Sequence, residues 1–403
     1  MTLRRAAIVA PIRTAVGRFG GTLAPLSAGQ LGAVVLKSLI ERTGIDPTRI
    51  DDVVFAQGYG SGEAPAIGRW SWLAADLPIT VPGYQLDRRC GSGLQAILNA
   101  AMTVQTGVSD IVVAGGCESM SNVEHYTTDI RGGVRTGNLT LHDRLTRGRV
   151  MSQPIERFGV ISGMIETAEN LARDYEITRE AADAYAVRSH QRAAKAWNEG
   201  LFADELVPVM VPQRKGDPVI FDRDEGYRTD ASMESLARLK PIEGGVVTAG
   251  NASQQNDAAA ACLVVAEDKL SEFGLEPIAW LHSWAVAGCD PSRMGIGPVP
   301  AVERLFERTR LSWSDIDLVE LNEAFAPQVL AVLKGWGWSE NDSRMDILNV
   351  NGSGISLGHP IGATGIRILA NLTRELRRRS GRYGLETMCI GGGQGIAAVF
   401  ERA

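Results

Sequence analysis

The chain has 403 residues, and about 150 residues per domain predicts two or three domains. Its composition, with 44% hydrophobic and 22% charged residues, excludes collagen, coiled coil and general disorder. The formal net charge of −6 provides no basic field, so neither nucleic acid nor a membrane surface is expected as a partner.

The first predicted element is a strand at the apolar run from Ala6 to Ala10. Pro11 and Arg13 follow too soon for a signal peptide. No stretch of about 18 apolar residues occurs in the chain, so we expect no membrane-spanning segment. The five cysteines are too scattered for a disulfide framework and lack the spacing of zinc ligands. We therefore expect a reduced, cytoplasmic protein that holds no metal.

A faint internal repeat organises the elements that follow. Residues 41–53 (ERTGIDPTRIDDV) and 307–319 (ERTRLSWSDIDLV) both predict the end of a helix, a polar turn and the start of a strand. Residues 91–107 and 363–381 form a second pair of similar segments, and each follows the corresponding member of the first pair along the chain. Each predicts a helix that opens on small residues and leads into a buried strand ending in glycines. Two pairs of similar segments in the same order indicate that one part of the chain arose as a duplicate of the other.

Strands that alternate with helices in both copies predict βαβ units and a largely parallel sheet. The expected fold class is therefore α/β, with residues 1–122 and 280–403 as two similar halves. Residues 123–247 have no counterpart in the repeat. We expect them to form a domain inserted in the first half, which residues 248–279 then complete.

The insert is expected to be irregular over residues 125–149 and helical afterwards. One helix is predicted over residues 164–175 and a second from Arg179 to Asn198, with Thr178 as its N-cap. His190 belongs to the charged face of the second helix and is expected to be exposed to solvent. After the insert, residues 246–268 predict a strand, a turn and a second strand.

Two predicted helix starts carry groups suited to catalysis. Cys90 opens the run Cys-Gly-Ser-Gly directly before a helix, where free N–H groups lower a thiol pKa and can hold an oxyanion. The alternative is a buried structural cysteine, but the small-residue context favours a nucleophile. Among the five histidines, His359 alone lies in a glycine-rich loop before a helix, where a base can approach a substrate.

Two strand ends carry the remaining candidates. Cys389 precedes a glycine turn (Ile-Gly-Gly-Gly-Gln-Gly), and on its own it is well explained as a core cysteine. The turn opens no helix, which excludes a dinucleotide-binding loop. Asn322 follows a strand predicted from Ile316 to Leu321, at the carboxyl edge where ligands of α/β sheets gather.

Five short segments follow one another along the chain: CGSGLQA, GNAS, NEAFA, GHPIGATG and CIGGGQG. Together they resemble, in the same order, the signature blocks of the thiolase family of acetyl-CoA acyltransferases, and the stretch APIRTAVGRFGG is also similar. The resemblance implies a duplicated, five-layered αβαβα fold whose inserted loop domain binds CoA and makes oligomer contacts. It also implies acyl transfer in fatty acid metabolism, acetyl-CoA and other CoA thioesters as substrates, no further cofactor, and a homotetramer built as a dimer of dimers.

The same resemblance implies roles for the candidate residues. Cys90 would be the acylated nucleophile of a ping-pong reaction, and Cys389 would be the acid/base cysteine. His359 would activate Cys90 and, with Asn322, hold a water as one oxyanion site. The backbone amides of Cys90 and Gly391 would form the other oxyanion site.

Residues that contact CoA and the acyl group follow from the same comparison. Arg228 and Ser235 match loop-domain positions at the adenine nucleotide, where an arginine can stack or pair with charge. Ser253 matches a serine near the pantetheine. Three further positions match residues that line the acyl end of the site: Met164, Met294 and Phe325.

Some stretches depart from the family's pattern. Short-chain biosynthetic members carry a histidine where this chain has Gly163, and residues 144–149, with three arginines, differ from the common tetramerisation loop. The direction of the reaction, the chain length and branching of the acyl group, the pathway, the choice between dimer and tetramer, and the roles of Trp70 and Trp72 stay open.

Two other functions remain as alternatives. A condensing enzyme of the ketoacyl-synthase type shares the fold and a cysteine nucleophile but lacks a second catalytic cysteine, so Cys389 favours a thiolase. A non-catalytic acyl-CoA or sterol-carrier binding protein on a thiolase scaffold would lose its catalytic residues first. All of them are present: Cys90, Asn322, His359 and Cys389.

Overall fold

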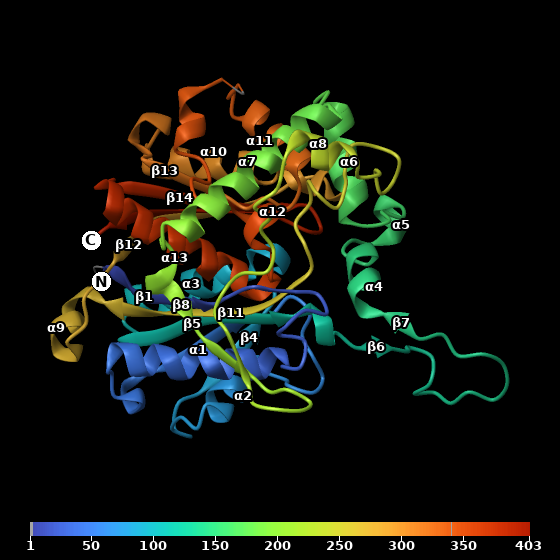
Figure 1. Ribbon diagram of the computed structural model, residues 1–403. Coiled ribbons are helices and arrows are strands. Elements are labelled where there is room, and N and C mark those ends of the chain that lie inside the picture. The colour runs from blue at the N-terminus through green and yellow to red at the C-terminus, as the bar shows by residue number, and fades with distance from the viewer. Residues whose placement is uncertain (1–2, 340) are drawn as a thin grey trace.

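The computed structural model describes residues 3–339 and 341–403 and stacks its elements in five layers. Figure 1 shows two sheet regions, one above the other, with helices between them and on both outer faces. The expected α/β class with an αβαβα arrangement is confirmed. The first region contains β1 (Ala6–Thr14), β3 (Asp52–Ala56), β4 (Gly83–Leu86), β5 (Ile111–Ser119) and β11 (Asn256–Ala266), and the second contains β12 (Ala279–Gly288), β13 (Leu318–Leu321), β14 (Tyr383–Ile390) and β15 (Gln394–Arg402).

The strands of the two regions repeat one order, β1-β11-β5-β3 in the first and β12-β15-β14-β13 in the second, with β4 added beyond β3. In each copy two antiparallel pairs are followed by a parallel pair. The regions join through the pairs Ala7–Trp280 and Ile8–Ala279 of β1 and β12. The strand order agrees with the duplication inferred from the sequence. The prediction of a largely parallel sheet is wrong, because β11 and β15 run antiparallel to both of their neighbours.

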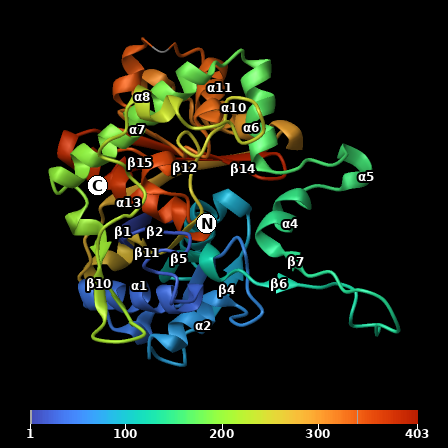
Figure 2. The ribbon, with the colours of Figure 1, turned by 45° about the vertical axis from the view of Figure 1, so that its right-hand side comes forward.

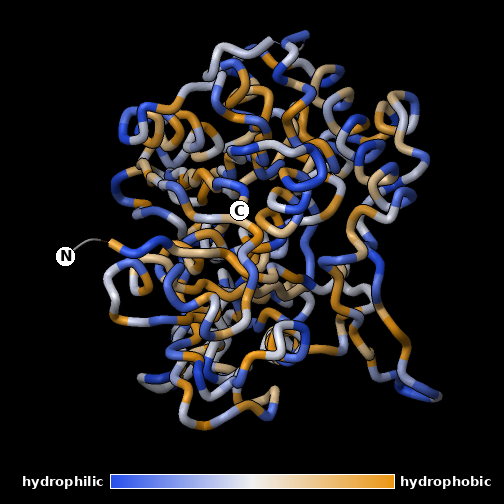
Figure 3. The backbone as a smooth tube through the Cα atoms, turned by 90° about the vertical axis from the view of Figure 1, so that its left-hand side faces the viewer, coloured by the Kyte–Doolittle hydropathy of each residue, from blue (hydrophilic) through white to orange (hydrophobic). Residues whose placement is uncertain are grey.

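Apolar side chains fill the space between the layers, and Figure 3 shows hydrophobic segments running through the middle of the molecule. The helices between the sheet regions are α3 (Ser92–Gln105) and α13 (Ile361–Arg379). The outer face of the first region is covered by α1 (Ala28–Thr43) and α2 (Ile67–Ala74), and that of the second region by α10 (Pro298–Thr309) and α11 (Ala326–Gly335). Figure 2 shows the same stacking after a turn.

The two central helices touch at a pair of glycines. A Cβ added to Gly93 of α3 would lie 2.8 Å from the backbone nitrogen of Gly365 in α13. A Cβ added to Gly365 would lie 2.0 Å from the backbone nitrogen of Leu94. Both distances are shorter than atoms tolerate, so this crossing needs glycine on both helices. The contact lies within the first five residues of each helix and therefore brings the two helix starts together.

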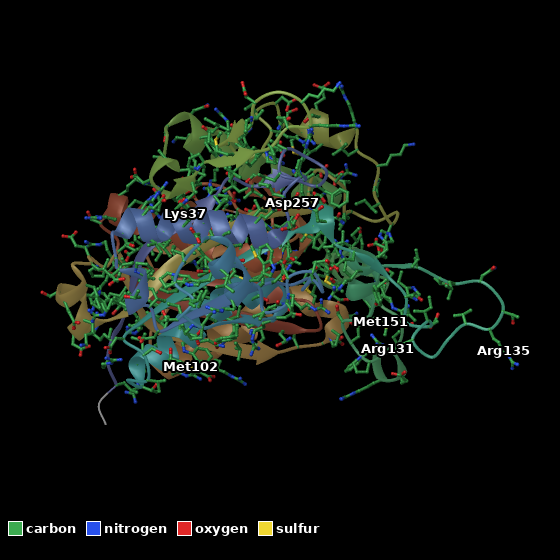
Figure 4. All side chains as sticks on the ribbon, turned by 90° about the horizontal axis from the view of Figure 1, so that it is seen from below. Lys37, Met102, Arg131, Arg135, Met151 and Asp257 are labelled. Carbon is green, nitrogen blue, oxygen red and sulfur yellow. The ribbon has the colours of Figure 1, made fainter. Side chains whose placement is uncertain are left out.

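The insert begins with a projecting loop and continues as helices. The loop joins β6 and β7 and extends away from the body of the molecule in Figure 1, and Arg135 is labelled near its tip in Figure 4. The expected N-cap is confirmed, since the Thr178 hydroxyl accepts the Ala181 N–H. The elements are β6 (His125–Tyr126), β7 (His142–Asp143), α4 (Arg144–Val150), α5 (Ile155–Phe158), α6 (Met164–Asp174), α7 (Arg179–Asn198), β8 (Leu206–Val207), β9 (Val209–Val211), β10 (Val219–Phe221) and α8 (Met233–Ala237).

The second part of the insert packs on both halves. β8 pairs with β1, and α7 contributes to the core of the second half. A buried ion-pair network fixes this arrangement: the Arg13 guanidinium of β1 donates to Glu205 at 2.6 Å and to Asp224 at 2.7 Å. A buried charge needs such partners, so both carboxylates keep the insert on the first half. The short elements β2 (Gly17–Arg18), α9 (Leu270–Phe273) and α12 (Gly354–Leu357) complete the chain.

Two expectations about single segments are wrong, and the roles of Trp70 and Trp72, left open by the sequence, are now visible. Residues 246–268 contain one strand, because β11 begins only at Asn256 and the preceding residues form a loop. His190 is buried, not exposed, and its Nδ1 accepts the Arg228 N–H at 3.2 Å. Trp70 and Trp72 pack α2 in place: the Trp70 ring covers Gly29 of α1, and the Trp72 indole N–H donates to the Pro78 carbonyl. No helix in the described part of the chain is long and apolar enough to cross a membrane.

Candidate active site

Cys90 lies where the chain turns from β4 into α3. It is the middle residue of a single 3-10 turn, Arg89–Gly91, and only 9% of it is exposed. Arg89 adopts the left-handed conformation with φ 49°, which costs about 1–2 kcal/mol for a residue with a Cβ. Its N–H donates to Asp87 Oδ1 at 2.6 Å and holds the turn. The strained turn places Cys90 at the start of a central helix.

Burial raises the pKa of the Cys90 thiol, while the Gly391 N–H and the Arg89 guanidinium oppose that rise. The expectation that the helix start would lower this pKa is wrong, because removing a thiolate from water outweighs the nearby donors and charge. Cys90 is therefore a neutral thiol at neutral pH. It needs a neighbouring base to act as a nucleophile.

Cys389 is fully buried near the end of β14. Burial raises the pKa of its thiol well above the usual range, and its proximity to the Cys90 sulfur raises it further. Cys389 packs against apolar residues that include Met294 and Phe325. The structure thus brings a thiol from each half of the chain to one place.

The glycine turn between β14 and β15 directs a backbone donor toward Cys90. Gly392 and Gly393 both adopt φ 85°, a conformation that favours glycine, and so reverse the chain at once. The Gly391 N–H just before them lies near the Cys90 sulfur and opposes the rise of the pKa of its thiol. Together with the amide of Cys90 itself, it provides two N–H donors beside the nucleophile, which is the arrangement of an oxyanion hole.

His359 lies just before α13, and its ring is oriented by a hydroxyl. Thr364 Oγ1 is 3.0 Å from the Pro360 carbonyl and 2.7 Å from His359 Nδ1. A hydroxyl has one hydrogen, and a carbonyl can only accept, so Thr364 donates to Pro360 and accepts from His359 Nδ1–H. The neutral ring then carries its lone pair on Nε2. Within the described chain Nε2 has no hydrogen-bond partner.

Burial lowers the pKa of His359 to about 3, and the positive charges of Arg367 and Arg149 add to the effect. The imidazole is therefore neutral at physiological pH. A neutral imidazole with a free Nε2 lone pair can accept a proton from a thiol.

Asn322 directly follows β13, and its side chain lies next to His359. Its Nδ2 lies 3.5 Å from His359 Nδ1, and its Oδ1 is buried without a partner among the described residues. The next residue, Glu323, fixes this loop, because its carboxylate accepts hydrogen bonds from Tyr185, Ser189 and other donors. The motif thus combines an anchoring carboxylate with an amide side chain directed at the site.

A cavity of about 480 Å³ opens beside these groups. Its wall includes the nucleophile and base candidates Cys90 and His359 together with Gly391. It also includes the expected pantetheine and acyl-end residues Ser253, Met164, Met294 and Phe325. Arg228 and Ser235 do not line it; Arg228 is exposed, and Ser235 completes the capping box that Ser232 begins at the start of α8.

Residues beyond the expected set also line the cavity or act next to it. Thr364 orients His359, and the cavity wall includes Tyr59, Arg89 and Arg149. Thr364 and Arg89 were detectable in the sequence, since one belongs to the His359 motif and the other directly precedes Cys90. Tyr59 and Arg149 lie in segments whose approach to the site depends on tertiary packing.

Chemistry, not size, identifies the site. A larger cavity of about 810 Å³ lies between α7 and α11, but no cysteine or histidine lines it. The cavity at Cys90 combines the Cys90 thiol, the neutral His359 imidazole and the paired amide donors of Cys90 and Gly391. A second thiol, that of Cys389, is packed against residues of the cavity lining. This set can transfer an acyl group through a thioester. The described residues contain no cluster of side chains suited to hold a metal ion.

Comparison with protein families agrees with this geometry. The family model "Thiolase, N-terminal domain" matches residues 6–268, and "Thiolase, C-terminal domain" matches residues 275–402. An acetyl-CoA acetyltransferase of Chromobacterium violaceum is 47% identical over 401 residues, which cover 98% of this chain and 99% of the relative. A beta-ketothiolase of Cupriavidus necator is 43% identical over 403 residues and 99% of both chains.

Solved structures give the same result. The Bacillus anthracis acetyl-CoA acetyltransferase superposes with a TM-score of 0.94 at 42% identity, covering 100% of both chains. Human mitochondrial 3-ketoacyl-CoA thiolase in complex with CoA superposes with a TM-score of 0.91 at 37% identity, covering 100% of this chain and 99% of the human chain.

Proposed function

Because the chain belongs to the thiolase family, we propose that it is an acetyl-CoA C-acyltransferase. It cleaves a 3-ketoacyl-CoA with CoA, or runs the reverse Claisen condensation of acetyl-CoA with an acyl-CoA. The observation that carries this proposal is that Cys90 and His359 line one cavity while the buried Cys389 thiol lies next to Cys90, because this chemistry needs both an acyl carrier and a second acid/base group.

In the first half-reaction His359 Nε2 takes the proton of the Cys90 thiol, and the sulfur attacks the 3-keto carbon. The C2–C3 bond then breaks, and its electron pair leaves as the enolate of acetyl-CoA. Cys389 gives its proton to that carbanion. The acyl group stays on Cys90 as a thioester, which is as readily transferred as one of CoA itself.

In the second half-reaction the Cys389 thiolate takes the proton of an incoming CoA thiol. The CoA sulfur attacks the acyl-Cys90 carbonyl, and the Cys90 sulfur leaves with the proton held by His359. Each residue returns to its starting state. Condensation is the same path in reverse, with Cys389 removing a proton from the α-carbon of acetyl-CoA.

Two oxyanion sites stabilise the charges that develop. The amides of Cys90 and Gly391 bind the oxygen of the acyl group on Cys90, and the direction of the Gly391 N–H supports this role. Asn322 and His359 bind the enolate oxygen through a water, which the unpartnered Asn322 Oδ1 and His359 Nε2 support. Each site contributes about 2.7–4 kcal/mol to the transition state.

The CoA moiety lies along the insert. Ser253 contacts the pantetheine, and Arg228 and Ser235 contact the adenine nucleotide outside the cavity, while Met164, Met294 and Phe325 enclose the acyl end. No further cofactor or metal takes part. The protein works in the cytoplasm as a homotetramer, a dimer of dimers in which the insert makes the oligomer contacts, and the projecting loop between β6 and β7 supports this.

A ketoacyl-synthase-type enzyme and a non-catalytic binding protein are the alternatives. The test is turnover of 3-ketoacyl-CoA thioesters of increasing length, with and without a 2-methyl branch, in the presence of CoA. Malonyl-CoA is offered in parallel as a decarboxylating donor. We expect CoA-dependent cleavage and no decarboxylation. Decarboxylative condensation without thiolysis would favour the synthase, and binding without turnover would favour the carrier.

A further inference from the structure

Two guanidinium groups line the catalytic cavity beside the reactive residues. Arg89 directly precedes Cys90, and Arg149 belongs to the last turn of α4. Arg89 Nη2 donates to the Gly148 carbonyl at 3.3 Å, and Arg149 Nε donates to the Tyr59 hydroxyl at 3.3 Å. These contacts bring both arginines to one wall of the cavity, formed by α4, Tyr59 and the Cys90 turn.

Neither guanidinium has a carboxylate partner within salt-bridge distance among residues 3–339 and 341–403. Glu243 is the one carboxylate of the cavity lining, and it comes from the segment that leads to Ser253 rather than from the arginine wall. Arg89 and Arg149 each use one of their guanidinium N–H donors within the described chain, both toward neutral oxygens, whereas two carboxylates hold the guanidinium of Arg13. The arginine wall therefore offers a site for an anion that comes with the substrate.

The position of the arginines decides which part of the substrate that anion belongs to. Both guanidinium groups line the same cavity as Cys90 and His359, and their charges act on these two residues, so they lie within reach of an acyl chain bound to Cys90. The phosphates of CoA lie at the far end of the pantetheine arm, many bonds from the thioester. A carboxylate on the acyl chain can reach the arginines, and the forked guanidinium matches its two oxygens.

We propose that the preferred acyl group carries a carboxylate at its far end, bound by Arg89 and Arg149. The substrate class is thus a 3-oxo-dicarboxylyl-CoA, cleaved to acetyl-CoA and the CoA thioester of a shorter dicarboxylic acid. This inference rests on the thiolase function proposed above and adds the identity of the acyl chain. Arg89 and Arg149 act as specificity residues that bind the end of the chain away from the bond being broken.

The test compares charged and uncharged substrates of equal chain length. Thiolysis of 3-oxoadipyl-, 3-oxosuberyl- and 3-oxosebacyl-CoA is measured against 3-oxohexanoyl-, 3-oxooctanoyl- and 3-oxodecanoyl-CoA. The readout is the ratio of the two kcat/KM values within each pair. At the length that reaches the arginines we expect the charged member to be favoured by roughly 10- to 100-fold, the value of hydrogen bonds to a charged group.

Substitutions then assign the preference to the arginines. Arg149→Met and Arg89→Met should each lower the ratio about tenfold or more, and Arg149→Lys should lower it less, because a lysine keeps the charge but loses the fork. Arg147→Met is the matched control, since Arg147 lies on the same helix but contacts His142 and does not line the cavity. It should leave the ratio unchanged, and melting temperatures check that each variant folds.

A wild-type enzyme that cleaves uncharged chains as well as charged ones at every length would overturn the inference and leave the thiolase function standing. A charged-chain preference that persists in Arg149→Met and Arg89→Met would also overturn it, because the carboxylate would then bind elsewhere. Failure to cleave any of the six thioesters would contradict the proposed function itself, and the inference with it.

Discussion

The starts of the two central helices occupy the same place in the repeat but carry different chemistry. Cys90 precedes α3 in the first half, and His359 precedes α13 in the second. The helices cross at Gly93 and Gly365, so both starts face one cavity. The duplication thus supplies two facing positions, and each half fills its position with a different reactive group. A single half would hold the proposed nucleophile without its proposed base.

The buried cysteines of the matching strands β5 and β14 extend this comparison. Cys117 and Cys389 are both 0% exposed, and burial raises the pKa of each. Cys117 packs in the apolar core of the first half, next to Glu118. Cys389 lies beside Cys90 and the residues of the cavity. Burial alone therefore does not distinguish a structural cysteine from a reactive one; the neighbours do.

Replacing two buried cysteines of the first half, Cys90 and Cys117, separately should give the largest contrast. Cys90→Ala removes the acyl carrier, so we expect no acyl-enzyme and a loss of about 10⁴-fold or more in thiolysis. Cys117→Ala is the control and should keep activity while lowering stability by about 1 kcal/mol. Mass spectrometry after incubation with labelled acetyl-CoA measures the adduct. A stable adduct in the Cys90 variant would refute the nucleophile assignment.

Removing the reactive group of the other helix start should have the next largest effect. His359→Ala leaves the Cys90 thiol with a raised pKa and without its base, so acylation should slow about 10²- to 10⁴-fold. Raising the pH should partly restore the rate, because hydroxide then supplies the thiolate that His359 no longer generates. Rapid-mixing measurement of acylation tests this. An unchanged acylation rate at neutral pH would show that Cys90 is activated by another group.

The glycine contact between the helices should be sensitive to a single methyl group. Gly365→Ala places a Cβ against the backbone of α3, so the helices must move apart, at a cost of about 1–3 kcal/mol in stability. Activity should fall as well, since Cys90 and His359 separate. Gly62→Ala is the control, because a Cβ there meets nothing within 4 Å. If Gly365→Ala behaved like the control, the crossing would not depend on that glycine.

The pH dependence should reflect the neutral state of His359. Its pKa is lowered to about 3 in the folded chain and is about 6.5 when unfolded. The unfolded state alone gains a proton below about pH 6.5, so stability is fully present above that pH and is lost as the pH falls toward 3. At about pH 5.5 the loss is about 1.4 kcal/mol. His359→Gln should show a smaller drop in urea-unfolding free energy between about pH 7.5 and about pH 5.5, and an equal drop would contradict the assignment.

Much of the fold followed from local patterns. The helices that begin at Met164 and Arg179 needed only periodicity and caps, such as Thr178, and the repeated strand order agrees with the inferred repeat. The sheet was harder, because strand direction depends on where β11 and β15 return after long connections, and no local pattern encodes that. His190 was placed wrongly for the same reason, since Arg228, whose N–H it accepts, is distant in sequence.

The candidate site residues were predictable from the sequence where a residue of a reactive type stands at a fixed position in a recognisable motif. The motifs pointed to Cys90, His359, Asn322 and Cys389, and the structure brings these residues together. The sign of the Cys90 pKa shift was not predictable, because it depends on how completely the other half of the chain covers the thiol. The position of Arg149 at the cavity could not be predicted from the sequence either, because it depends on how α4 packs.

The central claim is that Cys389 serves as the acid/base group while Cys90 carries the acyl group. Cys389→Ser tests it most directly, with acetyl labelling of Cys90, steady-state condensation and melting temperature measured on one preparation. A serine cannot readily hold the anion that abstracts the α-proton, so condensation should fall by several orders of magnitude while labelling and stability persist. Parallel loss of labelling and condensation, with a lowered melting temperature, would show that Cys389 is a structural cysteine and contradict the account.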